Sequence, residues 1–254
     1  MAINVDTVYK TVLLILNKEQ RGYVTPPEFN KIATQVQLEI FEKYFEDLNQ
    51  QMRVPQNDSE YGNRVKNVDE KISIFKNIKS LTPSWVVGTN KFNISAALGT
   101  IVPAVHRIGT VIYKDERELE EVNRNNWLRL NMSLLTKPNA DNPMYLYEND
   151  EIIIQPPDLI QVDNSTTPPT IVDEFSLSYV KKPENVVWGY TILSNGAYSY
   201  DPTIGVSVDF EIDDTDQTEV IIRILMYMGI IIRDPQIVQA AAQQAQMEEQ
   251  NQKS

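Results

Sequence analysis

A long amphipathic stretch that begins near residue 25 constrains the fold more than any other part of the sequence. Thr25-Pro26-Pro27-Glu28 supplies a capping-box pair and places prolines at the first helical positions, where a missing amide proton costs nothing. The apolar residues that follow lie three or four positions apart: Phe29, Ile32, Val36, Ile40, Tyr44 and Leu48, with Ala33, Phe41 and Phe45 beside them. This spacing predicts one long helix whose broad apolar face must pack against partner elements.

Two more helices are predicted in the first 80 residues, one on each side of this stretch. Apolar residues between Val8 and Leu16 recur at helical spacing and predict a first helix, which Gly22 ends. After a proline break, the apolar positions from Tyr61 to Phe75 alternate by four and three, which is typical of an amphipathic helix. The N-terminal part therefore favours a helical bundle.

After Pro83 the sequence changes character and predicts a β-rich domain. Gly, Pro and Asn become frequent, and short β-favouring stretches replace the long amphipathic ones. Hairpin turns are expected at Asn149-Asp150 and at Asn195-Gly196. Strands are predicted at residues 100–105, 110–113, 144–147, 151–155, 175–180, 186–193 and 197–200, with a short helix around Trp127, Leu130 and Leu134.

Helical spacing returns near the end of the chain. Apolar residues between Val220 and Met228 form a stripe after an acidic start, and carboxylates suit the positive end of a helix. After Asp234-Pro235 the chain is rich in Ala and Gln with few apolar anchors, so we expect it to become helical only when docked. The residues expected to contact a protein partner are Ile237, Val238, Ala241, Ala245 and Met247.

These patterns together predict an α+β protein. Its helical bundle would consist of three N-terminal helices and a returning C-terminal helix, with a β-rich domain inserted between them. The expected parts are a bundle at 1–82, a β-rich domain at 83–209, a returning helix at 210–233 and a C-terminal Ala/Gln-rich docking tail at 234–254.

Charge and composition exclude several classes of function. The chain has no Cys, which excludes disulfides, thiol catalysis and thiolate metal sites and fits assembly in a reducing cytoplasm. A net charge of -12 disfavours stable nucleic-acid binding, although an acidic wall would let DNA slide past without sticking. Apolar runs fall far short of the ~20 residues that a bilayer-spanning helix needs, and the N-terminus does not resemble a signal peptide, so neither a membrane span nor secretion is expected.

The sequence contains no recognisable catalytic or cofactor motif. His106 is the only histidine and no nucleophile motif lies beside it, so we expect a structural role for it. No Gly-rich loop precedes a Lys-Ser or Lys-Thr pair, and no dinucleotide-binding fingerprint occurs. With 35 acidic residues a carboxylate pair for glycoside hydrolysis could always be nominated, so such a pair carries no information. We therefore expect no enzyme activity and no cofactor.

Two features leave a binding alternative open. The densest carboxylates, Asp209, Glu211, Asp213, Asp214, Asp216 and Glu219, could hold calcium. The central Gly of a calcium loop is absent, however, and Phe210 and Ile212 alternate with the acids, so helix capping and a solvated strand face are favoured. Trp85, Trp127 and Trp188 could stack on sugars, although tryptophans in a β domain more often belong to a core or an interface.

Four segments, taken in order, carry a family resemblance. They are residues 20–26 running into Phe29-Asn30 and 37–42, residues 107–111, residues 179–183 with 188–190, and Phe210-Glu211 before the last helix. In this order they resemble a family of virion proteins from short-tailed bacteriophages, crAss-like phages among them, that form rings in the head-to-tail connector. The order of helices, β-rich insertion and returning helix is also similar to the podovirus tail tubular or adaptor fold.

The resemblance implies a structural role in the virion. Such a protein would form a homo-oligomeric ring, typically a dodecamer, beneath the portal protein, where it bridges portal to tail and lines the DNA ejection channel. Its partners would be copies of itself, the portal, adjacent tail or ring proteins and the passing genomic DNA, with the virion neck as its location and the host cytoplasm as its place of assembly. The alternative is a tail-associated carbohydrate- or receptor-binding module built on the β domain and its tryptophans.

Overall fold

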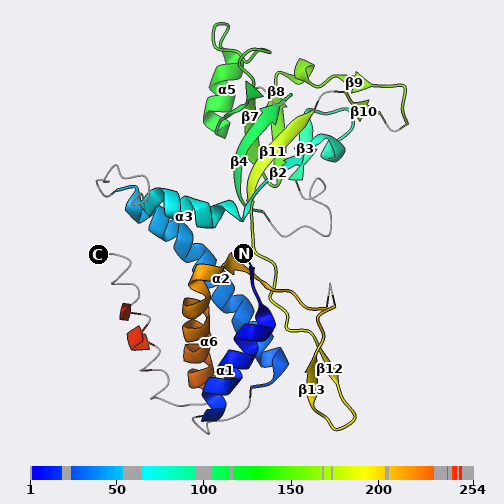
Figure 1. Ribbon diagram of the computed structural model, residues 1–254. Coiled ribbons are helices and arrows are strands. Elements are labelled where there is room, and N and C mark those ends of the chain that lie inside the picture. The colour runs from blue at the N-terminus through cyan, green and yellow to red at the C-terminus, as the bar shows by residue number, and fades with distance from the viewer. Residues whose placement is uncertain are drawn as a thin grey trace. The chain divides into compact units, whose positions relative to one another are not determined.

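The computed structural model describes residues 2–18, 24–53, 64–94, 105–114, 117–167, 169–172, 174–203 and 206–231, together with 239, 242–244 and 246–247. The chain divides into two compact units. Met1–Ile74 and Pro183–Ser254 form one, which we call the helical unit, and Phe75–Lys182 form the other, which we call the β unit. Figure 1 shows helices and β-sheets segregated along the chain, which confirms the α+β class.

The helical unit is built from both ends of the chain. Its helices are α1 (Val5–Lys18), α2 (Pro26–Gln51), α3 (Arg64–Ser73) and α6 (Gln217–Ile231). Both α1 and α2 contact α6, and α2 also contacts α3 (Figure 1). The prediction that the N-terminal helices pack with the returning helix is therefore confirmed.

Helix α2 begins and packs as its sequence predicts. The backbone amide of Thr25 donates to the Glu28 carboxylate at 2.9 Å, and the Thr25 hydroxyl donates to the same oxygen at 2.6 Å. These hydrogen bonds lower the pKa of the Glu28 carboxyl. The predicted stripe is buried from Phe29 to Phe45, whereas Leu48 is only partly buried near the end of the helix.

Short strands join the two ends of the helical unit. β1 (Ala2–Ile3) pairs antiparallel with β14 (Phe210–Asp213), which leads through the 3-10 turn η3 (Asp214–Asp216) into α6. The Asp209 carboxylate accepts a hydrogen bond from the amide of Val5 at 2.8 Å. The start of α1 and the approach to α6 are therefore held side by side.

The second predicted hairpin is present, but in the helical unit. β12 (Tyr190–Ile192) and β13 (Tyr198–Tyr200) pair antiparallel around Gly196, whose φ of +79° suits glycine. Residues 183–209 were expected in the β-rich domain. They lie with the helices because Asn30 of α2 accepts a hydrogen bond from the Trp188 amide at 2.8 Å and the Trp188 ring packs on Tyr9, with centroids 4.4 Å apart.

The described part of the β unit contains two four-stranded sheets. One has the order β2 (Lys76–Ser80), β11 (Phe175–Lys181), β4 (Val105–Tyr113) and β5 (Arg117–Glu118). The other has the order β3 (Lys91–Asn93), β8 (Glu151–Gln155), β7 (Met144–Glu148) and β6 (Glu120–Glu121). The smaller elements are η1 (Thr82–Ser84), η2 (Pro157–Leu159), β9 (Val162–Asp163), β10 (Thr170–Ile171) and α5 (Arg124–Met132). Every strand pair in these two sheets is antiparallel except β6 with β7.

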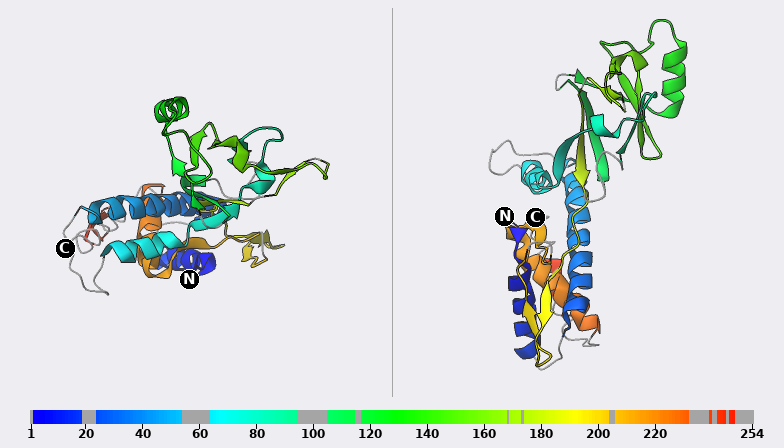
Figure 2. Two further views of the ribbon diagram at one scale, coloured as in Figure 1. Left: turned by 90° about the horizontal axis from the view of Figure 1, so that it is seen from above. Right: turned by 90° about the vertical axis from the view of Figure 1, so that its right-hand side faces the viewer.

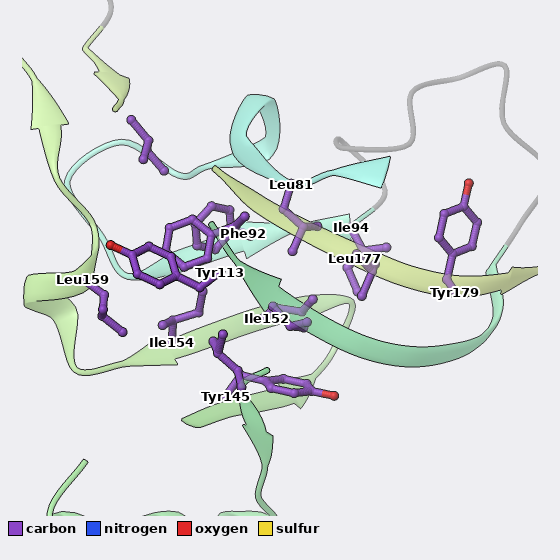
Figure 3. Packing of buried hydrophobic residues seen from close by; sticks show 14 residues of the cluster. Leu81, Phe92, Ile94, Tyr113, Tyr145, Ile152, Ile154, Leu159, Leu177 and Tyr179 are labelled. Atoms are coloured by element: carbon purple, nitrogen blue, oxygen red, sulfur yellow. The ribbon is translucent and has the colours of Figure 1, made fainter. Parts of the chain in front are cut away.

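Apolar side chains from both sheets form one core (Figure 3). Phe175 is fully buried, and its ring lies 5.0 Å from that of Tyr113 and 5.2 Å from that of Phe92. Ile152 and Ile154 enter the same cluster from β8. Alternate residues of β4, β8 and β11 therefore supply the core, as the period of two requires.

The first predicted hairpin is confirmed, and the start of the β unit is corrected. Asn149 and Asp150 both have positive φ, 51° and 65°, as the turn between β7 and β8 requires. The β-rich part was expected to begin after Pro83, but β2 already pairs with β11 from residue 76. The amide of Lys181 donates to the Phe75 carbonyl at 2.8 Å, so the unit begins at that point.

Helix α5 packs on the second sheet through one face. Trp127 and Leu130 lie against Met144 and Leu146 of β7. The helix ends at Met132, and Leu134, predicted to belong to it, lies in the following turn with its side chain fully exposed. The prediction was wrong at this end because the apolar spacing in the sequence continues past Met132, whereas the backbone of Ser133 is already extended, with ψ of 131°.

Some predicted features lie outside the described residues. These are Gly22, Tyr61, the strand at 100–104, and the docking residues Ile237, Val238, Ala241 and Ala245. Met247 is described and is 62% exposed. No helix in the described ranges is long and apolar enough to cross a membrane.

Candidate functional site

The acidic segment before α6 divides into two parts with different surroundings. In β14, Phe210 and Ile212 are buried while Glu211 and Asp213 are partly exposed, which confirms the predicted alternation. Asp213 accepts a hydrogen bond from the amide of Thr215 at 2.9 Å, and this bond lowers the pKa of its carboxyl. This first part therefore forms a strand and caps the turn that follows.

The second part consists of Asp216 and Glu219, and both side chains are buried, which corrects the expectation of a solvated face. Asp216 is only 7% exposed and accepts hydrogen bonds from the Tyr44 hydroxyl at 2.5 Å and the Lys71 ammonium at 2.7 Å. Burial, followed by the charge of Asp216, raises the pKa of Tyr44 far above its ordinary value. One carboxylate thus links α2, α3 and the start of α6.

Glu219, one turn further on, anchors a second set of ionic contacts. Its carboxylate accepts hydrogen bonds from Lys43 at 3.0 Å and from Arg223 at 2.8 Å. Burial acts to raise the pKa of Glu219, but the contacts with Lys43 and Arg223 outweigh it, so the pKa lies below its ordinary value. Arg223 also lies 3.7 Å from Glu39, which accepts a hydrogen bond from Tyr227.

The charges of this cluster cancel one another. The cluster contains three carboxylates, those of Glu39, Asp216 and Glu219. They face three cationic side chains, those of Lys43, Lys71 and Arg223. Within the described ranges no group of three or more His, Cys, Asp or Glu side chains is arranged to hold a metal ion. Buried charges that are paired and hydrogen-bonded act as structural contacts, so the cluster fixes the helices of the helical unit against one another.

The three tryptophans do not form an exposed sugar-binding surface. Trp188 is 4% exposed, and its indole N–H donates to Asp6 at 3.1 Å. Trp127 is 8% exposed under α5. Trp85 is partly buried against the core of the β unit, and its indole N–H donates to the Thr89 carbonyl at 2.7 Å. The favoured prediction, a core or interface role, is therefore confirmed for Trp127 and Trp188, and the alternative of exposed aromatic platforms loses these two residues.

His106 and the clefts of the β unit offer no recognisable catalytic arrangement. His106 lies in β4 and is partly buried. A cleft of about 640 Å³ lies between the turn after α5 and the segment that follows β8. Its described lining consists largely of prolines and amide side chains, and it also includes Tyr113 and Lys137. A smaller hollow of about 400 Å³ lies beside the first turn of α5 and β7. Neither lining brings a nucleophile and a base together among the residues that the structure describes.

Exposed apolar side chains lie together at several places in the described residues, and the sequence did not predict their exposure at two of these. The first is the C-terminal end of α5 and the turn after it, where Leu134 and Leu135 are 100% and 97% exposed. The second is the tip of the β12–β13 hairpin, with Ile192 and Leu193. The signal for the first site was the pair Leu134-Leu135 itself, which continues a helical pattern after the helix has ended.

Comparison of the chain with protein-family models and with curated proteins found no match. The candidate functional features are therefore defined by their own chemistry. They are the charge-paired cluster of the helical unit and the apolar side chains that both units expose to solvent. Such surfaces are typical of proteins that bind other proteins.

Proposed function

We propose that this chain is a structural subunit of a ring in the head-to-tail connector of a tailed bacteriophage. The ring would lie beneath the portal, bridge portal to tail and surround the path of the DNA. The chain would work by binding copies of itself and its neighbours, without an enzymatic reaction or a cofactor.

The observation that carries the proposal is the ordered set of four segments that resemble the connector family. Each segment contributes a residue on which the fold depends. Thr25 caps α2, Val111 is fully buried in β4, Trp188 packs on α1 and Phe210 is fully buried in β14. The presence of a fold-forming residue in each segment supports a common architecture, and the lack of a catalytic signature in the sequence of those segments fits a mechanical role.

Two physical properties support the same function. The buried cluster around Asp216 and Glu219 ties α2, α3 and α6 together, which suits a subunit that must keep its shape under load. The net charge of -12 suits a channel wall, because a wall that repels phosphate lets the duplex pass without binding.

The experiment that tests the proposal is a copy-number measurement on purified virions. Quantitative mass spectrometry would compare this chain with the portal protein of the same particles. Equal copy numbers are expected for a ring attached to the portal. Absence from particles would overturn the structural role, and a copy number far from that of the portal would move the chain to a fibre or another tail component.

The carbohydrate- or receptor-binding alternative loses its main support. It depended on tryptophans exposed on the β domain, and Trp127 and Trp188 are buried while Trp85 packs on the core. A glycan array with the full chain would test it directly, and specific binding there would revive it.

A further inference from the structure

The β12–β13 hairpin of the helical unit is a two-stranded sheet whose outer edges are both open. Within the described ranges no third strand pairs with it, and the left view of Figure 2 shows it standing apart from the helices of its unit. Its base is fixed, because the buried Trp188 ring stacks on Tyr190 and Tyr200, with centroids 6.0 and 5.7 Å apart. A two-stranded hairpin is only marginally stable in water, so a further strand would stabilise it.

The backbone groups of four hairpin residues point to these open edges. Next to the turn, the amide of Leu193 donates to the Ala197 carbonyl at 2.9 Å. At the base, the amide of Asp201 donates to the Gly189 carbonyl at 3.0 Å. Opposite residues of an antiparallel pair alternate between those that exchange hydrogen bonds and those whose backbone groups point outward. The outward groups therefore belong to Tyr190 and Ile192 in β12 and to Tyr198 and Tyr200 in β13. Within the described part of the chain, none of the four makes a backbone hydrogen bond outside the hairpin.

These edges lack the features that normally keep an edge strand from pairing. Natural edge strands are protected by charged side chains, prolines and bulges. Residues 185–200 contain no charged residue and no proline, although Lys, Arg, Asp and Glu make up 23% of the chain. By contrast, the outer strands of both four-stranded sheets carry charges: Lys76 and Lys79, Arg117 and Glu118, Lys91, and Glu120 and Glu121. An added strand is therefore opposed less at the hairpin than at these sheets.

The two edges of the hairpin complement each other, which points to a second copy as the source of the added strand. β12 and β13 are equally long, and each directs the backbone groups of two residues outward at the same spacing. Copies related by rotation hold their hairpins in the same orientation, so β12 of one copy runs antiparallel to β13 of the next. Copies with a net charge of -12 repel one another, and they do so least where their surfaces carry no charge.

We propose that β12 of one copy pairs antiparallel with β13 of a second copy. The inference rests on the proposed ring function and names the contact between neighbours. The contact is heterologous because it joins two different edges, so each copy binds one neighbour through β12 and another through β13. When the rotation closes this series, the hairpins form a continuous ring in which no edge stays open.

The first test removes one outward amide. Ile192→Pro deletes an N–H group that the hairpin does not use, and proline is tolerated at such edge positions. Self-association of the full chain, measured by sedimentation velocity, should weaken by about tenfold or more, because a carbonyl of the neighbour loses its hydrogen bond on burial. Unchanged Trp188 fluorescence, in chains whose other two tryptophans are replaced by Phe, checks that the hairpin stays folded.

The matched control is Ile78→Pro in the edge strand β2. Ile78 is 69% exposed, against 67% for Ile192. Its amide also points outward, because Lys181 donates to the Phe75 carbonyl and Ile78 lies three positions further along, at a non-hydrogen-bonded pair. This control should leave self-association unchanged. Equal effects of the two prolines, or a wild type that never self-associates, would overturn the contact.

The second test uses cysteines, which the sequence lacks. One chain carries Thr191→Cys in the middle of β12, and another carries Ser199→Cys in the middle of β13. In the proposed pairing the two positions face each other with Cα atoms about 4.5 Å apart, which is within reach of a disulfide. Oxidation of the mixture with diamide should give cross-linked dimers, and oxidation of either chain alone should not. Dimers from one chain alone, or none from the mixture, would refute the proposal.

These results are distinguishable from a failure of the proposed function. Copy numbers equal to those of the portal, with association that ignores Ile192→Pro, would keep the ring and overturn this contact. Association and cross-links as expected, in a chain that is absent from virions, would keep the contact and overturn the ring. A purified chain that stays monomeric, while Ile192→Pro prevents its incorporation into virions, would assign the edge to a strand of another protein and overturn the proposal.

Discussion

The buried carboxylate of Asp216 should be a principal stabilising contact of the helical unit. It accepts hydrogen bonds from Tyr44 and from Lys71, which come from two different helices. The replacement Asp216→Ala removes both acceptors at once and leaves the Lys71 ammonium and the Tyr44 hydroxyl without their partner. We expect a large loss of stability confined to the helical unit.

The magnitude follows from the geometry of the pair. Removal of one partner from a buried ion pair costs about 3–5 kcal/mol. The Lys71 side chain keeps 29% of its accessible surface, so it can return to water, and the loss should lie near the lower end, at about 3 kcal/mol. In a unit of this size each kcal/mol lowers the melting temperature by about 2–4 °C, so a decrease of about 6–12 °C is expected.

The assay can follow the helical unit alone. Trp188 is the one tryptophan of this unit in the sequence, so a chain with Trp85→Phe and Trp127→Phe reports its unfolding by fluorescence. The matched control is Asp214→Ala, which removes the same charge from an exposed position in the same turn. If the two alanine variants melt within a degree or two of each other, the reasoning about Asp216 is refuted.

Three further predictions concern the other parts of the chain. Residues 75–182, expressed alone, should fold cooperatively in calorimetry, because Lys181 already donates a hydrogen bond to Phe75 and the two ends meet; a molten or aggregated product would contradict this. Deletion of residues 235–254 should leave the melting temperatures unchanged but weaken the assembly of the chain, as measured by sedimentation velocity. If the truncated chain assembles normally, the prediction that Ile237 and Val238 dock on a partner is refuted. The pKa of Glu219 is lowered in the fold, so its stabilising contribution is complete at pH values above its ordinary pKa of 4.5 and is lost as the pH falls through the lowered pKa. Glu219→Gln should therefore make the free energy of unfolding less dependent on pH at acid pH, which denaturant unfolding at a series of pH values would measure.

What the sequence predicted best was structure encoded locally. The capping box at Thr25 and the stripe from Phe29 onward specify α2 without reference to other parts of the chain. The turn at Asn149-Asp150 is equally local, because both residues tolerate positive φ.

What the sequence did not predict depends on distant partners. Strand β2 contains one apolar residue, Ile78, and becomes a strand because it pairs with β11, about a hundred residues later. The burial of Asp216 depends on Lys71, 145 positions earlier in the chain.

The discontinuity of the helical unit imposes an order on synthesis. α2 is complete at residue 51, but its partner α6 ends at residue 231, so roughly 180 residues must be translated between them. At about 5–20 residues per second this takes roughly 10–40 s, during which the apolar face of α2 has no C-terminal helix to cover it. The β unit is complete well before that time. The nascent chain therefore passes through a stage in which the β unit has folded while α2 still lacks its partner α6. A chaperone would bind the chain at this stage.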